Sequence, residues 1–202
     1  RDTRIARIYE GTNEINRMLS VGMLIKKAMK GQLDLIGPAT AVGEELLGIP
    51  DFAIPDFSEP LSQENHILKN LKKVFLMIAG AGVQKYGTEL EEHQQLLLAV
   101  ADILIEVYMA ESAVLRAEKN VGVFGLEAQE HQLALSQLYL NQAVEKISTK
   151  GREAILGFAE GDEQKALLMG LKRFTKYMEY PNVIALRNKV AEKLTAENVY
   201  CF

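Results

Sequence analysis

The sequence is poor in the features that mark several large classes of protein. Its 202 residues include one cysteine, Cys201, which excludes an internal disulfide framework. It has no run of about eighteen uncharged apolar residues, so we expect no membrane-spanning helix. Its net charge is only −4, and no basic stripe is interleaved with aromatic residues. These absences argue against a nucleic-acid-binding protein.

The composition is that of an ordinary globular chain. Hydrophobic residues make up 48% and charged residues 25% of the sequence, which supplies enough apolar material for a core. The length allows one domain or two small ones. No signal peptide is recognisable. The chain opens at Arg1 instead of Met, in what reads as the middle of a structure. We therefore expect a fragment of a longer polypeptide, with any targeting signal upstream.

Helical periodicity dominates the sequence, whereas period-two alternation and β-branched runs are scarce. A first helix is predicted over 13–30. It ends on Lys26, Lys27 and Lys30 before Gly31, which is typical of a helix stop, because cations offset the free carbonyls and glycine allows a left-handed cap. The sequence thus predicts an all-α protein.

Prolines at five-residue spacing interrupt this pattern in "GIPDFAIPDFSEP". Proline removes a backbone donor and disfavours helix in the residue before it. We interpret 49–60 as a linker. It would separate an N-terminal piece, 1–48, which holds a second short helix at 34–47, from a C-terminal helical domain, 61–202.

The C-terminal domain is predicted to be an antiparallel bundle of three long helices and one or two shorter ones. The first long helix covers 61–86 and is broken at Gly87. Thr88, with Glu91 three positions on, has the form of a capping box and predicts the start of the second, which would end near Asn120. The later helices are expected at about 126–159, at 163–178 and from Pro181 onward.

Two Glu–His pairs raise the possibility of a metal site. Glu89 and His93 are four residues apart, as are Glu127 and His131. A di-iron bundle uses Glu-x-x-His twice, so the spacing is one residue too long in both places. We favour solvated pairs on a helix face and predict no metal site.

Asp102 and Glu106 interrupt the apolar run "LLLAVADILIEVYMAE" and lie on one helix face. Paired carboxylates could serve acid–base chemistry. Because no nucleophile or base pattern accompanies them, we prefer a polar stripe that pairs with Lys or Arg of a neighbouring helix.

The glycines of "AGAGVQKYG", Gly80 and Gly82, superficially resemble a phosphate loop. They lack the GxGxxG spacing and follow a helical segment instead of a strand. We expect them to let a neighbouring helix approach closely.

Basic and apolar residues could form a weak surface for an anionic membrane, although solvated faces are the commoner reading. The basic residues are Lys69, Lys72 and Lys73 with Lys26, Lys27 and Lys30, and the apolar ones are Phe52, Ile54 and Phe57.

The segment "RIYEGTNEINR" precedes the first helix. Thr12 or Asn13 can cap that helix, while Gly11 supplies a turn. Neither role explains Tyr9 and Glu10, so residue physics alone leaves their function open.

The longer stretch "RDTRIARIYEGTNEINR" resembles the acyl-CoA dehydrogenase family. There, an Arg-Asp pair, an apolar-rich segment and Tyr-Glu-Gly-Thr-x-x-Ile-x-Arg mark the loop that enters one of the last helices of the flavin-binding core. Arg1-Asp2 begins the pattern, Tyr9-Glu10-Gly11-Thr12 is its centre, and Ile15 and Arg17 complete it. The helical extension and the terminal "ENVYCF" are similar to the very-long-chain branch.

The resemblance implies a role for each central residue. Glu10 would be the base that removes the α-proton of an acyl-CoA thioester while the β-hydrogen leaves as hydride to FAD. Tyr9 would line the acyl pocket, and the Gly11 backbone would pass close to the substrate. The positions implied to line FAD are Thr12, Asn13 and Glu14.

The family also implies the setting. The full-length protein would convert a long-chain acyl-CoA to the trans-2-enoyl-CoA, act as a homodimer and reduce electron-transfer flavoprotein. It would be cytoplasmic in a bacterium, either free or peripheral to the membrane, and mitochondrial in a eukaryote. Since most of the flavin-binding core is absent, we expect this chain alone to be inactive and to bind no FAD. The alternative is a non-catalytic helical module for core packing, dimer contacts or peripheral membrane association.

Overall fold

The computed structural model describes residues 2–48 and 55–201, and these contain helices and no strand. The all-α prediction is confirmed. Among the described residues, no helix is both long and apolar enough to cross a membrane. The α-helices are α1 (Asn13–Met29), α2 (Ile36–Leu47), α3 (Ser62–Tyr86), α4 (Gln94–Phe124), α5 (Glu130–Phe158), α6 (Gly161–Phe174) and α7 (Val183–Glu197), and the 3-10 turns are η1 (Asp2–Arg7), η2 (Gly87–Glu92) and η3 (Glu127–Gln129).

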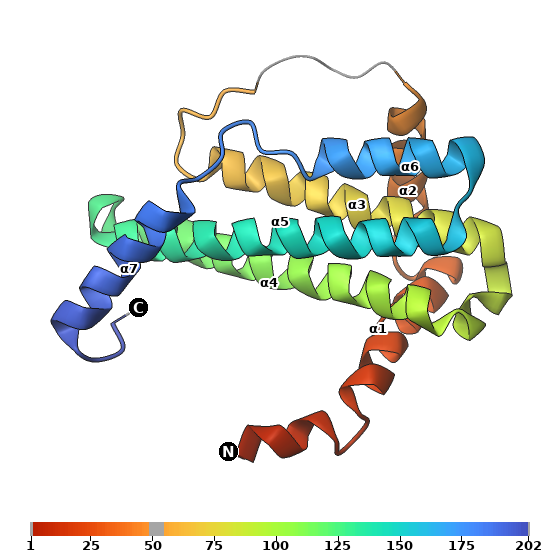
Figure 1. Ribbon diagram of the computed structural model, residues 1–202, viewed down its shortest axis with the longest axis horizontal. Helices are drawn as coiled ribbons and strands as arrows, with labels where there is room; N and C mark the ends of the chain where they lie inside the picture. The colour runs from red at the N-terminus through yellow and green to blue at the C-terminus, as the bar shows by residue number, and fades with distance from the viewer. Residues whose placement is uncertain (1, 49–54, 202) are drawn as a thin grey trace.

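The long helices α3, α4 and α5 lie side by side and alternate in direction, and α6 runs back along α3 and α5 (Figure 1). The core is formed where they meet, by Leu71 and Ile78 of α3, Ile103 of α4, and Leu140 and Ile147 of α5, all fully buried. Burying such aliphatic side chains stabilises the bundle by about 1.5–3 kcal/mol each.

The N-terminal helices pack on this bundle. Helix α1 lies against α4, and α2 lies against α3 and α6. A Cβ on Gly80 would lie 3.4 Å from Ala39 of α2, and one on Gly82 the same distance from Leu96, as expected for close approach. Residues 49–54 of the predicted linker lie outside the described residues, so the domain boundary stays a prediction.

Several predicted boundaries agree with the structure. Thr12 caps α1, because its hydroxyl accepts from the Ile15 N–H at 3.4 Å. The chain leaves α1 through Gly31, which has a φ of +68°. The last helix starts two residues later than predicted, because Asn182 is the cap and accepts from the Ala185 N–H.

The predicted capping box at Thr88 and Glu91 is wrong. Both residues lie in the 3-10 turn η2, and α4 begins after His93, without a side-chain cap. Leu90, in the middle of the turn, is buried, and the His93 ring stacks on Tyr86 at 3.6 Å between centroids. Tertiary burial and this ring contact thus hold a conformation that the local capping signal does not anticipate.

Candidate active site

Of the six candidate residues, Tyr9 to Thr12 lie between η1 and α1, and Asn13 and Glu14 are the first two residues of α1. Glu10 has a φ of +58° and Gly11 a φ of +93°, so two consecutive residues occupy the left-handed region. An L-residue such as Glu adopts this region rarely and at a cost of roughly 1–2 kcal/mol. Tyr9 and Glu10 are both exposed.

Side chains from the first turns of α1 fold back onto this loop. The Asn16 side-chain amide donates to the Gly11 carbonyl at 2.9 Å, while the Thr12 hydroxyl holds the helix start. The contact is close, since a Cβ on Gly11 would lie 2.6 Å from the Asn16 Oδ1. Asn16 is a site residue that the sequence analysis missed.

The start of α1 can receive a polar ligand. The first N–H groups of a helix have no intrahelical acceptor and carry partial positive charge. The Glu14 carboxylate itself interacts with this end of the helix. Its own backbone N–H, and then the Thr12 hydroxyl, lower the pKa of its carboxyl below the usual value. Asn13 and Glu14 are both exposed and therefore accessible to a ligand.

Arg17 anchors the helix of this loop to the bundle. Its guanidinium lies 2.5 Å from the carboxylate of Asp102 on α4, and both side chains are about a quarter exposed. The loop is therefore held at a defined place relative to α4.

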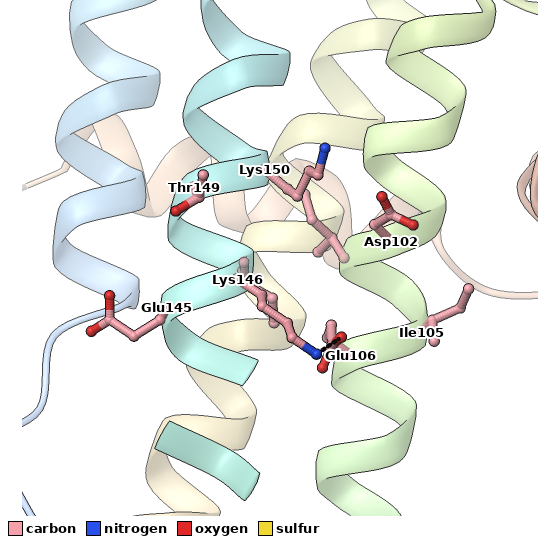
Figure 2. A pocket seen from close by; sticks show the side chains of 9 residues that line it. Asp102, Ile105, Glu106, Glu145, Lys146, Thr149 and Lys150 are labelled. Atoms are coloured by element: carbon pink, nitrogen blue, oxygen red, sulfur yellow. Dashed lines mark hydrogen bonds and ion pairs between the residues drawn. The ribbon is translucent and has the colours of Figure 1, made fainter. Parts of the chain in front are cut away.

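The second carboxylate of the predicted pair, Glu106, lies on a groove between α4 and α5 of about 480 Å³ (Figure 2). Lys146 pairs with it at 2.7 Å, and the Tyr139 hydroxyl donates to it at 3.1 Å. Burial, and then the charge of Glu106, raise the pKa of Tyr139 to about 12. Asp102 pairs with Arg17 of α1, and Glu106 pairs with Lys146 of α5. The prediction that the two carboxylates form a polar stripe paired with basic residues of neighbouring helices is confirmed.

A family model described as "Acyl-CoA dehydrogenase, C-terminal domain" matches residues 70–173, about half of the chain. This chain belongs to the acyl-CoA dehydrogenase family. The matched residues run from α3 to α6, so the bundle itself carries the family signature.

Relatives extend the match beyond the bundle, to 95% and 100% of this chain. A probable acyl-CoA dehydrogenase of Bacillus subtilis is 37% identical over 195 residues, which are 95% of this chain and 32% of that protein. The crystal structure of an acyl-CoA dehydrogenase complexed with FAD from Bacillus anthracis is 36% identical. It matches all of this chain and 34% of its own with a TM-score of 0.92. The chain thus spans about a third of the length of these relatives.

The histidines of this family member have structural neighbours. His93 stacks on Tyr86, and His131 lies 3.7 Å from Glu130 instead of its predicted partner Glu127. Within residues 2–48 and 55–201, no three His, Cys, Asp or Glu side chains gather closely enough to share a metal ion.

The basic cluster on α3 is largely engaged within the protein. Lys72 lies 2.5 Å from Glu111, and Lys73 lies 2.8 Å from Glu45. Of the apolar residues assigned to the same surface, Phe52 and Ile54 lie outside the described residues. Ion pairing leaves this face with less free positive charge than the sequence suggests.

Proposed function

We propose that the full-length protein is a FAD-dependent acyl-CoA dehydrogenase and that this chain supplies its catalytic base, Glu10. The observation that carries the proposal is the Tyr9-Glu10-Gly11-Thr12 motif, which precedes α1 in a chain that belongs to this family. Its two central residues, Glu10 and Gly11, have left-handed backbone angles. Because the chain spans only about a third of its relatives, the activity is assigned to the whole polypeptide.

The chemistry suits the residue. A thioester α-proton is a poor acid, and an exposed carboxylate is a weak base. Glu10 is exposed in this chain, so substrate and flavin would have to cover it. Desolvation by them would make the carboxylate a stronger base. FAD, when bound, would accept the β-hydrogen as hydride, while the electron pair left at the α-carbon forms the new double bond.

The residues at the start of α1 fit part of this cofactor. The N–H groups in the first turn of a helix can bind a polar or anionic group. This suits the positions that the family implies to line FAD, which are Thr12, Asn13 and Glu14. The Glu14 carboxylate already interacts with its own N–H, which disfavours a phosphate there and favours a hydroxyl donor of the cofactor. Tyr9 would form a wall of the acyl pocket, and Gly11 would let the substrate approach the backbone.

The finer assignments follow from the family. We propose a long-chain acyl-CoA as substrate, electron-transfer flavoprotein as electron acceptor, and a homodimer. The C-terminal bundle, which follows the motif, supports membership of the very-long-chain branch. The protein would act in the bacterial cytoplasm, or in mitochondria if it is eukaryotic.

The test is anaerobic stopped-flow reduction of the flavin of the full-length protein by palmitoyl-CoA. Glu10→Gln should retain FAD and bind acyl-CoA, but reduce its flavin about 10²- to 10⁴-fold more slowly, because the general base is lost. Glu118→Gln, at an exposed position on α4, is the matched control and should react normally. Ordinary flavin reduction in Glu10→Gln would refute the assignment of the base.

A second candidate is supported by apolar surface on α1. Ile15, Leu19 and Met23 recur at four-residue spacing and are each about half exposed. They favour a helical module that packs on a dehydrogenase core, on a second subunit or on a membrane. Purified 202-residue chain should then bind no FAD. Co-sedimentation with anionic vesicles would favour the membrane role, and its absence would favour protein packing.

A further inference from the structure

The loop that carries Glu10 needs a specific restraint. Its two left-handed residues end at Gly11, and glycine permits a wide range of backbone angles. Rotation at Gly11 would swing Glu10 relative to α1 without disturbing the helix. The Thr12 cap does not prevent this, because its bond to Ile15 lies within the start of the helix.

The Asn16 side chain supplies such a restraint. Its amide donates to the Gly11 carbonyl at 2.9 Å and so fixes the orientation of the peptide group at the pivot. Asn16 stands on the second turn of α1, where its backbone N–H donates to the Thr12 carbonyl at 2.9 Å. Its neighbour Arg17 ties the same turn to Asp102.

We propose that Asn16 is a positioning residue for Glu10, acting through its hydrogen bond to the Gly11 carbonyl. The inference rests on the proposed function, since it concerns the reaction of Glu10. Misplacing a base by a fraction of an ångström slows proton transfer even where substrate still binds. Losing this bond should therefore lower the rate of flavin reduction with little change in FAD content or in acyl-CoA affinity.

Two variants of the full-length holoprotein separate hydrogen bonding from packing. Asn16→Ala removes the amide and raises the intrinsic helix propensity, so a loss of rate cannot be assigned to a weaker helix. Asn16→Asp keeps the size but loses the donor. We expect both to reduce the flavin about twofold to tenfold more slowly, as for one modest hydrogen bond. Asn188→Ala, at an exposed position on α7, is the control.

Flavin reduction by α-deuterated and unlabelled palmitoyl-CoA gives the decisive readout. In both Asn16 variants the α-deuterium isotope effect should rise above that of wild type, because proton abstraction becomes slower relative to the other steps. Wild-type rates and isotope effects in both variants would overturn the proposal, as would loss in Asn16→Ala alone, which would indicate packing. Glu10→Gln is measured in parallel. If it reacts normally, the proposed function has failed, whereas an inactive Glu10→Gln beside normal Asn16 variants refutes the positioning role alone.

Discussion

Breaking the ion pair between Arg17 and Asp102 should loosen α1 from the bundle. The charged groups are 2.5 Å apart, and the side chains are 27% and 28% exposed. The Arg17 Nε is buried and has no hydrogen-bond partner in the part of the chain that the structure describes. The ion pair with Asp102 therefore offsets much of the free-energy cost of partly burying the Arg17 guanidinium.

The size of the effect follows from this partial burial. Exposed ion pairs typically contribute about 0.2–1 kcal/mol, whereas removing one partner of a fully buried pair costs about 3–5 kcal/mol. For a pair at intermediate burial we expect a coupling free energy of about 1–2 kcal/mol. The substitutions Arg17→Met and Asp102→Asn suit the measurement, because they remove the charges and keep most of the volume.

Urea unfolding of the 202-residue chain and of the three variants would give this coupling as a double-mutant cycle. The exposed pair Lys165 and Asp162, 2.9 Å apart on α6, is the matched control and should couple by less than about 0.5 kcal/mol. Equal couplings for the two pairs would refute the argument from burial. Added salt should weaken the control pair more than Arg17–Asp102.

Two further predictions concern the bundle. A Cβ on Gly151 would lie 2.8 Å from Leu171 Cδ1, whereas one on Gly157 of the same helix would have no atom within 4 Å. Gly151→Val should therefore lower the free energy of unfolding, measured in urea, by about 1–3 kcal/mol more than Gly157→Val does. Equal losses in the two variants would contradict this packing. The raised pKa of Tyr139, about 12 against 10.0, predicts a contribution to stability that is complete below pH 10 and lost as pH rises through 12. Phenolate absorbance compared with Tyr139→Phe checks it, and ionisation of Tyr139 near pH 10 would contradict the effects of its burial and of the Glu106 charge.

The helices were predictable because their signals are local. The first long helix was expected over 61–86 and spans Ser62–Tyr86, and Gly87 after it has a φ of +53°. The predicted capping box at Thr88 was wrong for the opposite reason. The turn there is held by the burial of Leu90, which depends on α3 and α4 meeting in space. For Asp102 the sequence predicted only that a Lys or Arg of a neighbouring helix would pair with it. It did not identify Arg17, because this ion pair joins helices far apart in sequence.

The candidate site was predictable only as far as its motif extends. Residues Tyr9 to Glu14 are contiguous, so a local resemblance names all of them. Asn16 stands at a variable position of Tyr-Glu-Gly-Thr-x-x-Ile-x-Arg, and its contact with Gly11 appears only in three dimensions. The chain spans about a third of its relatives' length, and a contact between Glu10 and the remainder would leave no pattern in this sequence.

Helix α7 differs from the other α-helices of the described residues because none of its 15 residues is buried. It lies across one end of α5, and the ion pair of Lys189 with Glu130 at 2.6 Å joins the two helices (Figure 1). With so little apolar surface removed from water, α7 should open and close many times during the lifetime of the folded bundle. Its amides would then exchange with solvent through local opening, while those of α3, α4 and α5 would exchange only through global unfolding. The chain would thus comprise two cooperative folding units of very different stability.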